Sequence, residues 1–337
     1  MGELIRVSDL QVSFNTYGGK VNAVRGVSFS VDEGQCVAIV GESGCGKSVT
    51  AKALMRLIPT PPGKIESGSI VYKGTDLMEL TDKQMRKIRG KEIGMIFQDP
   101  MTFLNPTMQI GKQIMESISK HTNIKRNEAY DRALEMLKLV EIPNPERRMK
   151  QYPYELSGGM RQRVIIAIAM VNHPKLLIAD EPTTALDVTI QAEIIDLLKS
   201  IQKKTQTSII LITHDLGVVA KMADTVLVFY AGKIVESANV RELFYHTKHP
   251  YTWGLLKSLP TFEMKSKGLL YSIDGSPPDL FSPPVGCGFA ARCEYAMGIC
   301  KCKYPESVHL EDGHEVACWM LNERAEAARE LAAVNGR

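Results

Sequence analysis

An apolar run followed by a glycine-rich loop constrains this chain more than any other stretch. Residues 36–40 read Cys-Val-Ala-Ile-Val, and Gly-Glu-Ser-Gly-Cys-Gly-Lys-Ser follows at 41–48. This GxxxxGK[ST] pattern predicts a strand, a phosphate-binding loop and a helix. The loop's glycines let its backbone N–H groups curl around an anion, and the helix start adds its positive dipole end. We therefore expect Lys47 to reach the β- and γ-phosphates of a nucleotide and Ser48 to coordinate Mg²⁺.

Composition agrees with a globular enzyme and excludes several other classes. The chain has 337 residues, of which 44% are hydrophobic and 23% charged, so it can bury a large core. A net charge of +3 is too small to indicate nucleic-acid binding, and we expect no such partner. No apolar stretch reaches the roughly 18 residues of a membrane span, and the N-terminus lacks a signal peptide. We expect a cytoplasmic location.

The first hundred residues predict an antiparallel lobe next to the loop. Residues 4–14 and 24–31 alternate apolar and polar side chains and are expected to be strands. Tyr17 lies between them, where an aromatic ring could stack on a nucleotide base, although a tyrosine beside a turn is more often a packing residue. Gln98 follows the apolar run 93–97, at the carboxyl end of a predicted strand, where ligands bind in open α/β sheets.

The middle of the chain predicts a helical insert and a second anion-binding helix start. Residues 110–121 and 127–140 carry apolar side chains at helical spacing. The sequence Leu-Ser-Gly-Gly-Met then leads at 156–160 into an apolar helix. Ser157 can cap this helix, and Gly158 and Gly159 leave its N-terminus open to an anion; a plain helix cap is the alternative interpretation.

Carboxylates and a histidine follow two further predicted strands. Asp180 ends the apolar run 176–180 and Glu181 follows it; Asp180 suits Mg²⁺ coordination, and Glu181 could polarise a water that attacks the γ-phosphate. His214 ends the next apolar run and so occupies the same kind of position as Gln98.

Together these motifs resemble the nucleotide-binding domains of ATP-binding cassette (ABC) transporters, over roughly residues 4–240. The resemblance implies an α/β fold with a P-loop NTPase (RecA-like) core, an antiparallel β lobe and a helical subdomain at about 99–165. It implies that Glu181 is the catalytic base and His214 the switch histidine, that Lys47 and Gln98 assist, and that Ser48, Gln98 and Asp180 hold Mg²⁺. Met160 replaces the glutamine usual after the signature glycines. The residues that the resemblance assigns to ATP are Tyr17, Gly41, Ser43, Gly44, Cys45, Gly46, Lys47, Ser48, Val49, Gln98, Ser157, Gly158, Gly159, Asp180 and Asp187.

Residues 241–337 form a second predicted region. His-Pro-Tyr-Thr-Trp at 249–253 and the proline-rich stretch near 277–284 resemble the C-terminal extension of oligopeptide and dipeptide permease ATP-binding subunits. This resemblance implies a subunit that hydrolyses ATP to power peptide uptake. Nickel or another small solute is an alternative substrate, and a soluble ABC ATPase is a less favoured class. A terminal helix is expected over 322–334.

Five of the seven cysteines lie in this second region, which indicates metal ligation rather than disulfides in a cytosolic chain. The spacing lacks the paired knuckles of structural zinc, and a [4Fe-4S] cluster is preferred, with Zn²⁺ as the alternative. A small Cys-rich metal-binding domain is therefore expected, because a tail too small for its own core needs a metal to hold it. Cys302 is expected to be spare, although it could replace Cys300. The expected ligands are Cys287, Cys293, Cys300 and Cys318.

With one phosphate loop and no membrane span, the chain needs partners. The family resemblance implies two transmembrane permease subunits, a second ATP-binding subunit that completes each ATP site, and indirectly an extracellular peptide-binding protein. It places the chain peripherally, on the cytoplasmic face of the membrane.

Overall fold

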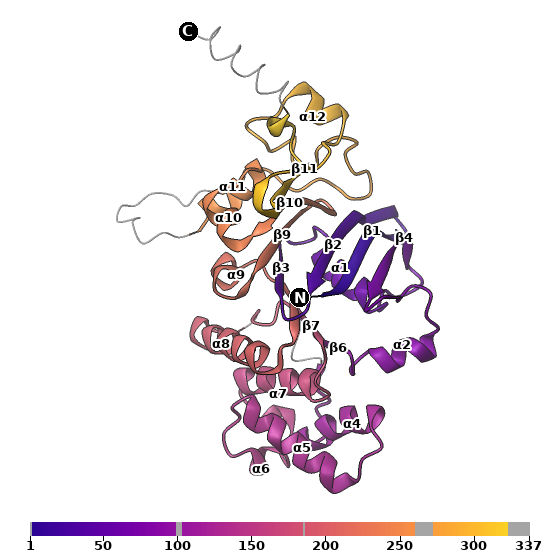
Figure 1. The fold of residues 1–337 in the computed structure, drawn as a ribbon, viewed down its shortest axis with the longest axis vertical. Helices are drawn as coiled ribbons and strands as arrows, with labels where there is room; N and C mark the ends of the chain where they lie inside the picture. The colour runs from indigo at the N-terminus through magenta and orange to yellow at the C-terminus, as the bar shows by residue number, and fades with distance from the viewer. Residues whose placement is uncertain (1, 99–102, 185, 260–271, 323–337) are drawn as a thin grey trace, which may run out of the picture.

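The computed structural model describes residues 2–98, 103–184, 186–259 and 272–322. Figure 1 shows a central sheet with a helical insert (α4, α5 and α6) at one end, an antiparallel lobe (β1, β2 and β4) at its side, and the C-terminal extension at the other end. The expected terminal helix over 322–334 falls almost wholly outside the described residues.

The central sheet has the order β11-β12-β10-β9-β3-β8-β7-β6. Its inner strands pair in parallel, whereas β10 and the short strands beyond it are antiparallel. All five residues of β3, β7 and β8 are buried, as expected for parallel strands covered on both faces. The strands are β3 (Cys36–Val40), β6 (Ile93–Ile96), β7 (Leu176–Asp180), β8 (Ser208–Ile212), β9 (Thr225–Tyr230), β10 (Lys233–Asn239), β11 (Val308–His309) and β12 (Glu315–Val316).

The antiparallel lobe is a second sheet of order β2-β1-β4-β5. Alternating apolar residues of its strands face α1, which runs out of the phosphate loop, and share one apolar core with it. Its elements are β1 (Glu3–Thr16), β2 (Gly19–Asp32), β4 (Gly63–Tyr72) and β5 (Thr75–Asp76), with α1 (Lys47–Leu54) and α2 (Asp82–Ile88) packed nearby.

The helical insert packs on the other side of the central sheet. Its two long helices fall where the apolar spacing predicts them, and their buried residues join one core with α7 and the sheet. The helices are α4 (Ile110–His121), α5 (Arg126–Leu139), α6 (Pro145–Arg148) and α7 (Gly158–Met170), with a 3-10 turn at Pro153–Glu155.

The C-terminal extension shares a core with the central sheet. Phe289 is buried against Tyr230 of β9 and Tyr251 of α11, with ring centroids 5.3 and 5.4 Å apart. The tail thus shares the sheet's core instead of forming a separate one, because it adds β12 to the sheet and packs on the sheet's apolar surface. The remaining elements are α8 (Val188–Thr205), α9 (Leu216–Met222), α10 (Val240–Tyr245), α11 (Pro250–Lys257) and α12 (Gly298–Cys302), with 3-10 turns at Glu311–Gly313 and Trp319–Leu321.

Candidate nucleotide site

The phosphate loop lies between the end of β3 and the start of α1, and its glycines are required by geometry. Gly41 has φ +148°, and a Cβ there would lie 2.2 Å from the carbonyl oxygen of Phe229. Gly46 has φ +103°, and a Cβ there would lie 2.4 Å from the carbonyl oxygen of Ala23. Both positions are left-handed and closed by backbone, so only glycine fits them.

Lys47 is the first residue of α1 and folds back over its own loop. Its Nζ donates to the carbonyl oxygens of Gly41 and Glu42, each at 2.8 Å, and the residue is buried. These bonds fix the ammonium among the loop atoms that the sequence assigns to phosphate. The backbone and the lysine together suit an anion with several oxygens.

Ser48 and Asp180 bring a hydroxyl and a carboxylate together from neighbouring elements. Ser48 Oγ donates to Asp180 Oδ1 at 2.8 Å. Burial raises the pKa of Asp180, and the Ser48 hydrogen bond and nearby lysines oppose this rise only in part. A desolvated carboxylate beside a hydroxyl is an oxygen donor pair that fits Mg²⁺, because the cation's charge would offset the cost of burying the carboxylate.

Glu181 lies at the centre of a polar group just beyond β7. Its Oε2 accepts from Gln98 Nε2 at 3.0 Å and from Thr184 Oγ1 at 2.8 Å, and its Oε1 lies 3.7 Å from His214 Nδ1. Glu181 has φ +48°, which is unusual for a residue with a side chain and turns the chain directly after Asp180. Gln98, Glu181 and His214, predicted from three separate strand ends, thus meet at one edge of the sheet.

The predicted signature lies at the start of α7. Ser157 is the N-cap of this helix and accepts from the backbone N–H of Met160. Gly159 faces α8, because a Cβ there would lie 2.7 Å from Ile190 Cγ2. Asp187 caps α8 by accepting from the N–H of the same Ile190. The structure thus places the signature beside the segment that contains Asp187.

Tyr17 is fully exposed at the turn between β1 and β2. Asn15, Thr16, Pro61 and Pro62 surround an open hollow beside it. An exposed ring in this position is accessible to a nucleotide base that stacks on it.

Sequence reasoning missed two residues that contact the phosphate loop from the extension. Tyr251 accepts a hydrogen bond from the backbone N–H of Glu42 at 2.8 Å, and Arg292 forms a two-pronged ion pair with the Glu42 carboxylate at 2.6 and 3.0 Å. The motif at 249–253 contains Tyr251 but gave it no role at the loop, and no pattern marked Arg292, because each residue's partner lies more than 200 positions away in the sequence.

The four cysteines predicted as metal ligands all lie in the extension, where Cys300 is buried and the other three are partly buried. Burial raises the pKa of Cys287 to about 11, and the thiols of Cys293 and Cys300 add to this rise. Burial likewise raises the pKa of Cys318 to about 12, with smaller contributions from the other three thiols. Cys302 is exposed. Across the described ranges, however, no three His, Cys, Asp or Glu side chains form a group that could hold a metal ion.

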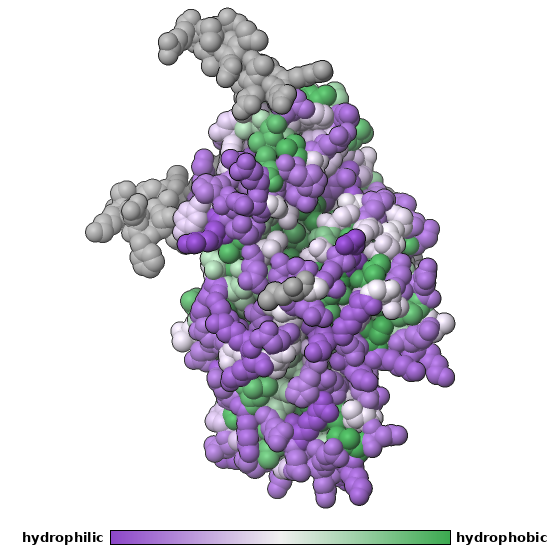
Figure 2. Space-filling view, viewed as in Figure 1, coloured by the Kyte–Doolittle hydropathy of each residue, from purple (hydrophilic) through white to green (hydrophobic). Residues whose placement is uncertain are grey.

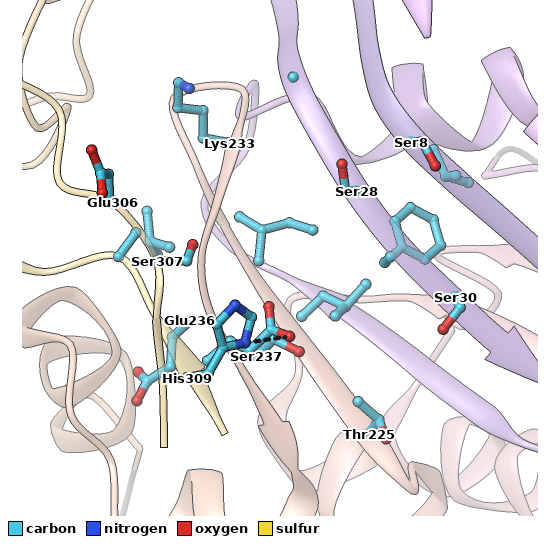
Figure 3. A pocket seen from close by; sticks show the side chains of 18 of the residues that line it. Ser8, Ser28, Ser30, Thr225, Lys233, Glu236, Ser237, Glu306, Ser307 and His309 are labelled. Carbon is cyan, nitrogen blue, oxygen red and sulfur yellow. Dashed lines mark ion pairs between the residues drawn. The ribbon is translucent and has the colours of Figure 1, made fainter. Parts of the chain in front are cut away.

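A cavity of about 740 Å³ lies apart from the predicted nucleotide-site residues. Figure 3 shows it between the antiparallel lobe, β10 and the extension, lined by Ser28 and Ser30 on one side and by Lys233, Ser307 and His309 on the other. None of the predicted nucleotide-site residues lines it. The site is instead an open edge of the sheet, which suits a ligand held between two surfaces.

The parallel sheet, the phosphate loop and the acidic strand end define an ABC-type ATPase. The chain matches two families, described as "ABC transporter" over residues 24–184 and "Oligopeptide/dipeptide transporter, C-terminal region" over residues 235–300. It is 57% identical to the oligopeptide transport ATP-binding protein OppD of Bacillus subtilis, over 99% of this chain and 93% of the relative. It is 54% identical to the dipeptide transport ATP-binding protein DppD of the same organism, over 97% of this chain and 98% of the relative.

Solved structures agree on the class. A dimeric ATP-binding cassette bound to ADP and Pi in a post-hydrolysis state has a TM-score of 0.63 and 28% identity, over 70% of this chain and 99% of that one. The chain therefore belongs to the ATP-binding subunits of oligopeptide and dipeptide ABC transporters, and it is an ATPase of that family.

A helix that crosses a membrane must be both long and apolar. In the part of the chain that the structure describes, no helix combines the length and apolarity needed to cross a bilayer. Figure 2 shows one face of the molecule, on which hydrophilic side chains dominate and hydrophobic ones form small separate groups.

Proposed function

We propose that this chain is the ATP-hydrolysing subunit of an importer that takes up oligopeptides or dipeptides across the cytoplasmic membrane. The main support is the group of Ser48, Asp180 and Glu181 at the edge of the sheet. The chain is also 57% identical to an oligopeptide transport ATP-binding protein. The names of the relatives support peptides over nickel or other small solutes.

Within this proposal each group near the loop has a role in ATP hydrolysis. The loop's N–H groups and Lys47 bind the phosphates, and Ser48, Asp180 and Gln98 hold Mg²⁺, which supplies charge neutralisation. Glu181 orients and deprotonates the attacking water. The hydrogen bonds that Gln98 and Thr184 donate to its carboxylate fix the orientation of that carboxylate. His214, beside the same carboxylate, stabilises the departing phosphate.

The proposal also includes partners that complete the site. A second ATP-binding subunit would contribute its signature to the ATP held here, while Ser157, Gly158, Gly159 and Asp187 of this chain would serve the partner's ATP. The open position of the site and the solved dimeric cassette support this arrangement. Two membrane permease subunits and an external peptide-binding protein would complete the importer, with this chain peripheral on the cytoplasmic side.

Replacing Glu181 tests the hydrolytic role. We expect Glu181→Gln to retain ATP binding and to lower turnover by about 10²–10⁴-fold in the assembled transporter, because the amide cannot accept the proton of the water. Glu146→Gln, on the exposed surface of α6, is the matched control and should hydrolyse ATP at the parent rate. Undiminished hydrolysis by the Glu181→Gln variant would exclude Glu181 as the base. Stimulation of ATPase activity by a peptide-loaded binding protein would separate peptides from nickel.

For the extension we propose that Cys287, Cys293, Cys300 and Cys318 bind a [4Fe-4S] cluster, with Zn²⁺ as the alternative. The support is the clustering of these cysteines in the sequence, all within the extension, and soft thiolates suit both metals. In the described residues the four thiols do not form a metal-holding group, so metal binding would have to draw them together. Iron, sulfide and zinc analysis of anaerobically purified protein tests the proposal. Cys293→Ala should abolish the bound metal, whereas Cys302→Ala should retain it. A metal-free parent protein would refute metal binding.

A further inference from the structure

Arg292 of the extension donates hydrogen bonds both to the phosphate loop and to residues beside it. Besides the two bonds to Glu42, its guanidinium donates to the Tyr230 hydroxyl at 3.2 Å and to the carbonyl oxygens of Asp274 and Ile273 at 2.8 and 3.0 Å. A guanidinium has five N–H groups, and all of them have acceptors here. Its side chain is only 6% exposed, so its position is fixed from every side.

Tyr251 fixes the backbone of the same loop residue. It is fully buried, and its ring packs edge-on against Tyr230 with centroids 4.5 Å apart. Its hydroxyl accepts the N–H of Glu42, while α11 is held in place at its start by His249. Both the side chain and the N–H of Glu42 are therefore held by residues from the extension.

This arrangement bears on ATP because of the charge of Glu42. A carboxylate in the second position of a phosphate loop repels phosphate oxygens when it is free to turn toward them. The Arg292 ion pair neutralises that charge and holds it away on the extension side. Without the arginine, the loop would carry an unpaired carboxylate and a backbone segment with fewer restraints.

We propose that Arg292 and Tyr251 are positioning residues for ATP, which act through Glu42 to hold the phosphate loop in its binding shape. The C-terminal extension is then a structural part of the nucleotide site. This proposal depends on nucleotide binding at the loop, but not on peptides being the substrate.

The test is the affinity of the full chain for Mg–ATP, measured by calorimetry. We expect Arg292→Ala to weaken binding about tenfold or more, Arg292→Lys to restore part of the loss, and Tyr251→Phe to weaken binding a few fold. The double variant Glu42→Gln/Arg292→Ala should bind more tightly than Arg292→Ala alone, because the unpaired carboxylate is gone. A purely structural role for the arginine does not predict this recovery.

Trp253→Phe is the matched control within the extension. Trp253 lies on the same helix as Tyr251. The substitution removes the hydrogen bond from its indole to the Thr247 carbonyl oxygen, which is not part of the phosphate loop. Its ATP affinity should equal that of the parent. Parent-like affinity of folded Arg292→Ala, or no recovery in the double variant, would overturn the proposal. If Arg292→Ala does not fold, the same comparison between Arg292→Lys and Glu42→Gln/Arg292→Lys decides.

Discussion

Glu236 joins the central sheet to the extension, and its removal should loosen that junction. The side chain is fully buried on β10. It accepts from the backbone N–H groups of Lys248 and His249 at 2.7 and 3.2 Å, and it pairs with His314 Nε2 at 2.9 Å. All three partners come from the extension, so the effect of a substitution is confined to one junction.

The size of the effect follows from these bonds. Glu236→Ala leaves two buried N–H groups and a buried imidazole without their acceptor. Breaking a buried pair by removing one partner costs about 3–5 kcal/mol, and we expect a loss of about 4 kcal/mol in the free energy of unfolding of this region. Glu236→Gln keeps one carbonyl oxygen and should lose about half as much.

The assay uses the chain's own tryptophans. Both of them, Trp253 and Trp319, lie in the extension, so their fluorescence during urea unfolding reports on this region. Glu315→Gln is the control, because Glu315 pairs with His309 on the surface and such pairs contribute at most about 1 kcal/mol. A loss below about 1 kcal/mol for Glu236→Ala would refute the reasoning.

Three further outcomes are expected. Burial lowers the pKa of His249 from 6.5 to about 4. Between these pH values the unfolded chain binds a proton that the native state does not. The free energy of unfolding should therefore fall by up to roughly 3 kcal/mol as pH drops from 7 to 4. Urea unfolding at several pH values should show this loss reduced in His249→Asn, which caps the helix without titrating. Gly41→Ala should abolish ATP binding in an affinity assay, because its Cβ would collide with the Phe229 carbonyl. Mass spectrometry after brief alkylation should find Cys302 modified and Cys45 intact, since Cys45 is buried and burial raises its pKa.

Each of these outcomes has a matched comparison. Gly44→Ala, where a Cβ meets no atom within 4 Å although φ is +78°, keeps the backbone strain without the collision and should bind ATP better than Gly41→Ala. Equal loss in both would remove the steric argument. A pH profile identical in the parent and His249→Asn would mean that other groups govern acid stability. Rapid alkylation of Cys45 in folded protein would contradict its burial.

Much of the nucleotide site was predictable because its residues lie at the ends of apolar strands. The runs that end before Gly41, Gln98, Glu181 and His214 become adjacent parallel strands, and parallel strands bring their carboxyl ends to one edge. The family motifs then gave each residue a role, which remains a prediction for the individual side chains.

The contribution of the extension could not be predicted in the same way. Arg292 follows no periodic pattern, and its partner lies 250 residues away, so only the folded chain brings them together. The buried carboxylate Glu236 sits in a strand whose sequence, Lys-Ile-Val-Glu-Ser-Ala-Asn, predicts nothing about which later residues will cover it. The cysteine spacing favoured a [4Fe-4S] cluster over Zn²⁺, yet among the described residues no three possible ligands lie together, so spacing along the chain did not predict the folded arrangement.

The separation between Glu42 and Arg292 has a consequence for biosynthesis. A growing polypeptide exposes its phosphate loop long before the ribosome reaches the arginine that pairs with it, because the two residues lie 250 positions apart. Domains fold in order as they emerge, so the cassette can assemble while this bond is still missing. On the proposal made above, only a chain translated past residue 292 holds the loop at its full affinity, and products that end before it would bind ATP more weakly. If Arg292 positions the loop as proposed, synthesis past residue 292 becomes a condition for full nucleotide loading.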